Sequence, residues 1–229
     1  MRKDGPVRIV VLSGGIGGAR FLRGVREWGR KQSAAVSITA VVNVGDDITL
    51  HGLRICPDLD SCMYTLADAH DERRGWGRQD ETWVIKEELA AYGAEPTWFG
   101  LGDKDIATHL VRTRMLAEGR PLSAVTAALC ARWFAHIDDP VRLVPATDGR
   151  LETHVVVQPA GEPSRTIHFQ EWWVRYRAAL PTGRFVFVGQ EDSEPAPGVR
   201  EALGEADLIL IAPSNPVVSA TPRTRWSSS

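Results

Sequence analysis

The feature that most constrains the fold is a glycine-rich turn near the start of the chain, in the stretch IVVLSGGIGGARF (residues 9–21). The apolar run before the turn is typical of a strand that is buried on both faces of a parallel sheet. After the turn, apolar residues recur at the spacing of a helix. These residues are Phe21, Leu22, Val25 and Trp28. Because a second apolar run follows at residues 37–44, the pattern predicts a right-handed parallel βαβ unit.

The rest of the chain extends this unit into one α/β domain, which we expect to cover residues 1–219. The predicted architecture is a Rossmann-like, mostly parallel sheet flanked by helices. A helical insertion is expected at about residues 58–136. After shorter strands, the segment RFVFVGQ (residues 184–190), a helix and a last apolar strand are predicted to form a final α/β unit. Residues 220–229 are polar, basic and rich in serine, which predicts a divergent disordered tail.

Composition excludes several classes of protein. The 229 residues are 43% hydrophobic and 24% charged, which is typical of a globular domain, and the formal charge of −2 argues against a nucleic-acid partner. Three cysteines without a C-x-x-C pair argue against a disulfide framework and a cysteine zinc site. No apolar run reaches the roughly 20 residues of a membrane span, and the start of the chain does not resemble a secretion signal. We therefore expect a cytoplasmic protein with no membrane partner.

The glycine turn has the chemistry of an anion site. Backbone N–H groups at such a turn converge on one concavity, and the following helix dipole adds partial positive charge. The turn matches neither the dinucleotide fingerprint nor the P-loop, because Arg20 stands where a third glycine belongs and no GK[ST] follows. Two interpretations remain open, a phosphate site of unspecified kind and a tight turn without a ligand.

Four aspartates are predicted at the edge of the sheet beside this turn. Asp46 and Asp47 come directly after the second strand, and Asp58 and Asp60 open the next helix. In open α/β sheets this edge is where ligands bind, and carboxylates next to phosphate oxygens are usual ligands of Mg²⁺. The alternative is that Asp58 and Asp60 only cap a helix.

Three later segments add candidate contacts. Lys104, in WFGLGDKDIATH, can meet a phosphate or a ring carbonyl, whereas His109 in the same segment is more simply an ordinary core or surface histidine. The aromatic segment HFQEWWVRY (residues 168–176) is either core or a pocket wall for a flat heteroaromatic ligand. Ser214 and Asn215, set between prolines, suit contacts with phosphate or sugar oxygens.

Six blocks in this order resemble the 2-phospho-L-lactate transferase family, in its bacterial phosphoenolpyruvate transferase branch. The blocks are LSGGIGGARFLRGV, AVVNVGDD, HGLRICPDLDSCMYTL, WFGLGDKDIATHLVR, HFQEWWVRY and LIAPSNPVVS. The resemblance runs from about Ile9 to Ser219. It departs from the family at ATPRTRWSSS, which stands where the family continues with further α/β elements, so the resemblance implies a C-terminally truncated fold.

The resemblance implies a Mg²⁺-dependent transferase of coenzyme F-420 biosynthesis, homodimeric in the full-length family. Such an enzyme moves a phosphoenolpyruvyl or 2-phospholactyl group from a guanosine-diphosphate-linked donor to the ribityl hydroxyl of 7,8-didemethyl-8-hydroxy-5-deazariboflavin, and GMP leaves. Phosphoryl-type transfer needs positioning and charge neutralisation more than covalent chemistry. The alternatives are a nucleotide-dependent Rossmann-like oxidoreductase and an inactive truncated remnant.

Roles follow from the same resemblance for residues that match the family's motifs. Gly14, Gly15, Gly17 and Gly18 are expected to hold the diphosphate, with Ser214 and Asn215 facing them. Asp47, Asp58 and Asp60 are the candidates for catalysis and for binding Mg²⁺. Lys104 is expected to touch the deazaflavin or the transferred phosphate, and Trp98, Phe99 and the HFQEWW segment to line the ring.

Overall fold

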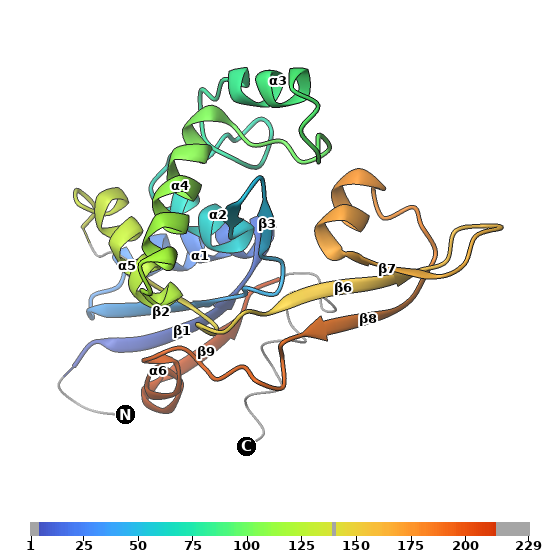
Figure 1. The fold of residues 1–229 in the computed structure, drawn as a ribbon. Helices are drawn as coiled ribbons and strands as arrows, with labels where there is room; N and C mark the ends of the chain where they lie inside the picture. Colours follow the sequence, from blue (N-terminus) through green and yellow to red (C-terminus); the bar gives the residue numbers. More distant parts are fainter. Residues whose placement is uncertain (1–4, 139–140, 214–229) are drawn as a thin grey trace.

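A computed structural model describes residues 5–138 and 141–213 of the chain, and its centre is a four-stranded parallel sheet in the order β5-β2-β1-β9 (Figure 1). These strands are β1 (Val7–Ser13), β2 (Val36–Val42), β5 (Arg142–Pro145) and β9 (Leu208–Ile211). Val11 of β1 lies opposite Ala40 of β2 on one side and Leu210 of β9 on the other. The parallel sheet with its flanking helices confirms the predicted α/β class.

Helices cover both faces of this sheet (Figure 1). α1 (Gly15–Arg30), α2 (Pro57–Leu66) and α5 (Leu122–Trp133) lie on one face, and α6 (Val199–Glu205) lies on the other. Successive residues of a strand point to opposite faces. Val11 therefore packs with the first group of helices, whereas Val10 packs with Val199 of α6. The apolar run of β1 is explained by this burial on both sides.

The segment between β2 and β5 contains a small hairpin and most of the helices. The hairpin is β3 (Ile48–Leu50) with β4 (Leu53–Ile55), paired antiparallel. After α2 come α3 (Val84–Ala91) and α4 (Asp103–Ala117), which extend away from the sheet in Figure 1, and then α5. These helices occupy the stretch in which the sequence predicts a helical insertion.

A second sheet differs from the sequence prediction. β6 (Glu152–Val157), β7 (Arg165–His168) and β8 (Thr182–Val188) form an antiparallel sheet in the order β7-β6-β8, with the short π-helix η1 (Glu171–Arg175) between β7 and β8. The segment RFVFVGQ was expected to join the parallel sheet before α6 and β9, and this expectation is wrong. Its strand pairs instead antiparallel with β6, where Phe185 packs in an apolar cluster with Val155 and Ile167.

Two further expectations concern the C-terminal tail and membrane-spanning helices. The predicted tail at residues 220–229 lies outside the described residues. Among residues 5–138 and 141–213, no helix combines the length and the apolar character needed to cross a membrane.

Candidate functional site

A cavity of about 1070 Å³ lies at the carboxyl ends of β1 and β2. It is bordered by the glycine turn, the first turn of α2, the segments around α3 and α4, and the start of η1. Ligands of open α/β sheets bind at this edge. Pockets for one small molecule usually measure about 300–1,000 Å³, so this cavity has room for more than one ligand.

The glycine turn brings backbone to the cavity, together with Ile16. Gly15 has a φ of 64°, in the left-handed region that favours glycine. Gly14, Gly15 and Gly17 line the cavity. Gly18 has a different place, because a Cβ added there would lie 2.6 Å from Ser13 Oγ in the preceding strand. Three of the four predicted glycines thus face the ligand space, and the fourth allows α1 to pack closely on β1.

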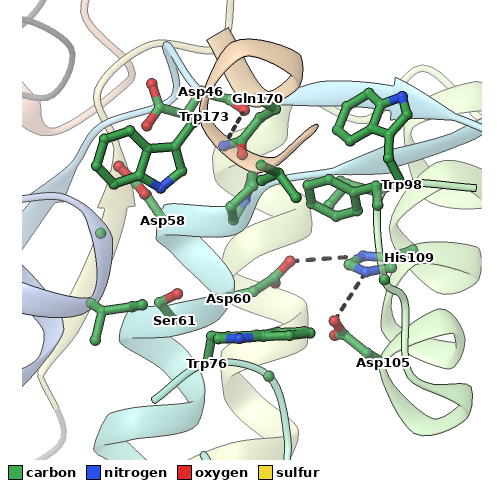
Figure 2. Close-up of a pocket in the computed structure, with 18 of the residues that line it drawn as sticks. Asp46, Asp58, Asp60, Ser61, Trp76, Trp98, Asp105, His109, Gln170 and Trp173 are labelled. Atoms are coloured by element: carbon green, nitrogen blue, oxygen red, sulfur yellow. Dashed lines mark hydrogen bonds and ion pairs between the residues drawn. The ribbon is translucent and has the colours of Figure 1, made fainter. Parts of the chain in front are cut away.

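Two carboxylates accompany the glycines at the cavity. Asp46 and Asp58 both line it, and Figure 2 shows them on the same side. Asn43 donates from Nδ2 to Asp58 Oδ2 at 3.0 Å, and its Oδ1 accepts from the N–H of Gly45 at 3.1 Å. A Cβ on Gly15 would lie 3.8 Å from Asp58 Oδ1, so this carboxylate is held close to the N-terminus of α1 as well as that of α2.

Asp47 is oriented differently from its neighbour. It is fully buried, is not among the residues that line the cavity, and places Oδ2 3.3 Å from Arg54 Nη2. Burial raises the pKa of Asp47 to about 7, although the Arg54 charge acts in the opposite direction. Of the adjacent pair Asp46 and Asp47, the structure brings Asp46 to the ligand space, whereas the sequence prediction favoured Asp47.

Asp60 lies at the bottom of the cavity within a network of charged side chains (Figure 2). Arg112 donates two hydrogen bonds to its carboxylate and a third to His109 Nδ1 at 3.1 Å. Because arginine can only donate, His109 Nδ1 accepts, and the ring proton is on Nε2, 3.3 Å from Asp105 Oδ2. Tyr64 donates its hydroxyl to Asp105 Oδ1 at 2.6 Å.

An ion pair and hydrogen bonds hold this network together. Burial opposes ionisation of Arg112, but the Asp60 carboxylate outweighs it and raises the pKa of the guanidinium. Burial likewise opposes ionisation of Asp105, yet its contacts with His109 and Tyr64 lower its pKa. The network therefore joins α2 to α4 through an ion pair and hydrogen bonds at the wall of the cavity.

Two groups of residues have donor atoms for a metal. Asp60, Asp105 and His109 have ligand atoms within 4.8 Å of one another. Arg112 already contacts two of them, so a further cation would meet a buried positive charge there. Asp46 and Asp58 present carboxylate oxygens beside the glycine turn, which is the donor chemistry that Mg²⁺ prefers. The residues at this second position therefore fit the ion better.

Aromatic side chains line the outer part of the cavity. Trp98 and Phe99 lie on the side of the helical insertion, with ring centroids 5.8 Å apart. On the other side Phe169 stacks on Trp173 of η1 at 5.9 Å, and 51% of Trp173 is exposed. The predicted aromatic residues Trp98, Phe99, Phe169 and Trp173 thus line the cavity. Trp172 of the same segment is not among the lining residues and packs with Phe185 instead. The structure adds Trp76, for which the sequence has no periodic signal.

Of the remaining predicted contacts, one does not line the cavity and two lie outside the described residues. The ammonium group of Lys104 donates to the backbone carbonyl of Gln79 at 3.1 Å, and Lys104 is not among the lining residues. Ser214 and Asn215 lie outside the part of the chain that the structure describes.

Sequence reasoning also missed residues that the structure brings together. Asp105, His109 and Arg112 are spaced i, i+4 and i+7, which places them on one face of α4, and this spacing was the available signal. Their partner Asp60 belongs to another helix, so no local pattern connects it to them. His109, for which the sequence favoured an ordinary role, lines the cavity.

Comparisons with known proteins agree with the six sequence blocks. A family model described as 2-phospho-L-lactate transferase CofD matches residues 9–225. The phosphoenolpyruvate transferase of Nocardia farcinica is 60% identical over 214 residues, which cover 93% of this chain and 62% of that protein. The phosphoenolpyruvate transferase of Mycolicibacterium smegmatis is 58% identical over 222 residues, covering 94% and 67% respectively. The chain therefore spans 62% and 67% of the lengths of these two relatives.

A solved structure shares the fold. The crystal structure of a UPF0052 family protein from Bacillus halodurans aligns with 96% of this chain and 63% of its own, with a TM-score of 0.59 and 19% sequence identity. At this level of identity the likeness concerns the arrangement of the sheet and helices alone.

Proposed function

Because the chain belongs to the 2-phospho-L-lactate transferase family, we propose that it is a transferase of coenzyme F-420 biosynthesis. The proposed reaction moves a phosphoenolpyruvyl or 2-phospholactyl group from a guanosine-diphosphate-linked donor to the ribityl hydroxyl of 7,8-didemethyl-8-hydroxy-5-deazariboflavin, with release of GMP. The names of the relatives favour the phosphoenolpyruvyl donor. We also propose a homodimer. The observation that supports the reaction is a single cavity that combines a glycine turn, carboxylates and aromatic walls.

The glycine turn is the proposed site of the donor's diphosphate. The N–H groups of Gly14, Gly15 and Gly17 and the dipole of α1 favour negative charge there. Asp58 is at the same helix end. A diphosphate and a carboxylate repel each other at this distance unless a cation neutralises them. This conflict of charges supports a Mg²⁺ ion held by Asp46 and Asp58.

The aromatic part of the cavity is the proposed site of the acceptor. A deazaflavin is flat and heteroaromatic, and aromatic side chains bind such rings by offset stacking and edge contacts. Trp98 and Phe99 lie on one side and Trp173 on the other. Figure 2 shows Asp58 and Asp60 of α2 deeper in the same view than Trp98 and Trp173, and we propose that the ribityl chain of a ring bound between the aromatic side chains extends toward these aspartates.

In the proposed reaction the ribityl hydroxyl oxygen attacks the phosphorus of the transferred group, and the bond from that phosphorus to the GMP oxygen breaks. The hydroxyl proton passes to a carboxylate of the cavity, for which we propose Asp58. The glycine N–H groups hold the phosphate oxygens in line, and a cation held by Asp46 and Asp58 would neutralise the charge that develops on them. Asp60 is committed to Arg112, and Asp47 is next to Arg54. We therefore assign both of these residues to supporting the site.

A transfer assay on the purified chain tests this proposal. The chain is incubated with the deazaflavin acceptor, Mg²⁺ and the guanylylated enolpyruvyl donor, and product and GMP are followed by mass spectrometry. We expect product that is lost with EDTA and falls by about 100-fold in Asp58→Asn, in the range of removing one acid–base group. Asp192→Asn, a change at an exposed loop residue, is the matched control and should leave the rate unchanged. Folded protein that makes no product would refute the proposed reaction for this chain.

A further inference from the structure

The loop that carries Asp46 is attached by its backbone to the antiparallel sheet. Its three successive carbonyls each accept a hydrogen bond from β6, β7 or the residues just after β7. The donors are Thr153 N to Gly45 O at 2.6 Å, Gln170 Nε2 to Asp46 O at 3.4 Å and His168 Nε2 to Asp47 O at 3.1 Å. The loop thus depends on residues more than 100 positions later in the sequence.

The same sheet fixes the side chain of Asp47. Arg54 lies between Asp47 and Glu152 of β6, with N–O distances of 3.3 and 3.5 Å. With its carbonyls directed to the sheet and Asp47 held on Arg54, the loop leaves Asp46 directed into the cavity (Figure 2). The different orientations of the two adjacent aspartates follow from this attachment.

His168 is a fixed donor in this arrangement. The backbone N–H of Gln170 donates to His168 Nδ1 at 3.0 Å, so the ring proton is on Nε2 and is donated to the Asp47 carbonyl. Burial, with a smaller effect of the His154 charge, lowers the pKa of His168 to about 4. At neutral pH the ring is therefore uncharged and keeps this single arrangement of hydrogen bonds.

We propose that the antiparallel sheet positions the cation-binding loop, and that His168 and Gln170 are its positioning residues. The inference rests on the proposed function in one respect, the role of Asp46 as a cation ligand. Gln170 also lines the cavity between Phe169 and Trp173. The aromatic side chains of Phe169 and Trp173 and the loop that carries Asp46 are therefore both held by the residues that follow β7. We expect a ring bound against these aromatic side chains to stabilise the position of Asp46.

Binding of Mn²⁺ to the full chain, measured by electron paramagnetic resonance, tests the inference without requiring turnover. Mn²⁺ takes the same oxygen ligands as Mg²⁺. We expect His168→Ala to raise the dissociation constant about tenfold, equivalent to about 1.4 kcal/mol, which is the scale of one hydrogen bond. His168→Gln, which restores an N–H donor, should recover affinity to within about threefold. His136→Ala changes the same residue type at an exposed position outside this sheet and should bind as the unmodified chain does.

Hydrogen exchange of the loop peptide, residues 43–50, separates positioning from loss of folding. Exchange should be faster in His168→Ala than in His168→Gln, while the melting temperatures show both variants folded. A folded His168→Ala with unchanged Mn²⁺ affinity would overturn the inference, as would absence of Mn²⁺ binding by the unmodified chain. Absence of transfer with the expected Mn²⁺ pattern would refute the proposed reaction and leave the positioning role supported.

Discussion

Two buried groups at the junction of the two sheets should give the stability of this protein opposing dependences on pH. The pKa of Asp47 is raised from 3.8 to about 7, so between these values the native state binds more protons than the unfolded state. Its contribution is fully present below pH 3.8 and is lost as pH rises toward 7. The pKa of His168 is lowered from 6.5 to about 4. Between these values the unfolded state binds more protons, so this contribution to stability increases with pH.

The two slopes overlap between about pH 4 and pH 6.5, and each has a limiting size of about 1.4 kcal/mol per pH unit. In the unmodified chain they oppose each other. In Asp47→Asn only the contribution of His168 remains. From pH 4.5 to 6.5 the free energy of unfolding of this variant should increase by about 3 kcal/mol relative to that of the unmodified chain. In His168→Gln only the contribution of Asp47 remains, so the free energy of unfolding should decrease by about the same amount, relative to the unmodified chain, over that pH range.

Urea denaturation followed by tryptophan fluorescence at pH 4.5, 5.5 and 6.5 measures both effects. Asp192→Asn, in an exposed loop, is the control and should parallel the unmodified chain. The reasoning fails if Asp47→Asn also parallels it, or if both variants change their pH dependence in the same direction.

Two further changes test the core of the site by urea or thermal denaturation. Arg112→Leu should lower the free energy of unfolding by about 3–5 kcal/mol because it leaves the buried Asp60 carboxylate without its guanidinium partner. Adding Asp60→Leu should recover part of this stability. A double variant no more stable than Arg112→Leu would contradict this. Gly18→Ala should cost about 1–3 kcal/mol because its Cβ would lie 2.6 Å from Ser13 Oγ, whereas Gly24→Ala, exposed on α1 with open space around it, should stabilise by about 0.5–1 kcal/mol. Equal shifts in the two alanine variants would contradict the proposed close packing.

Local patterns were sufficient to predict the first half of the parallel sheet. The apolar run of β1, the glycine turn and the helical spacing in α1 all act within about 20 residues, and the structure has each of them where expected. The pairing of β8 was not predictable in the same way. Its apolar run fits a strand in either sheet, and its pairing with β6 is decided by packing against residues distant in the sequence.

The site residues also divide into those that a local pattern predicts and those whose position depends on distant parts of the sequence. The position of Asp58 at a helix start follows from Pro57 and from its own charge. The choice between Asp46 and Asp47 depends on carbonyl hydrogen bonds from Gln170 and His168, which no local pattern contains. Lys104 lies in the first turn of α4 as expected, yet its ammonium group is directed to a backbone carbonyl.

The hairpin of β6 and β7 contacts the carboxylate loop at its base and not at its tip, so the two ends differ in how well they tolerate sequence changes. At its base, the Thr153 backbone N–H and the His168 side chain hold the carboxylate loop, so a replacement of His168 that removes its N–H donor disturbs the cavity. At its tip, residues 158–164, the chain is largely exposed, and Gly161 has open space around it. A reporter peptide or affinity handle inserted at the tip would extend outward from the same two strands without reaching the loop. The hairpin therefore offers an attachment point at which a label can be added independently of the chemistry.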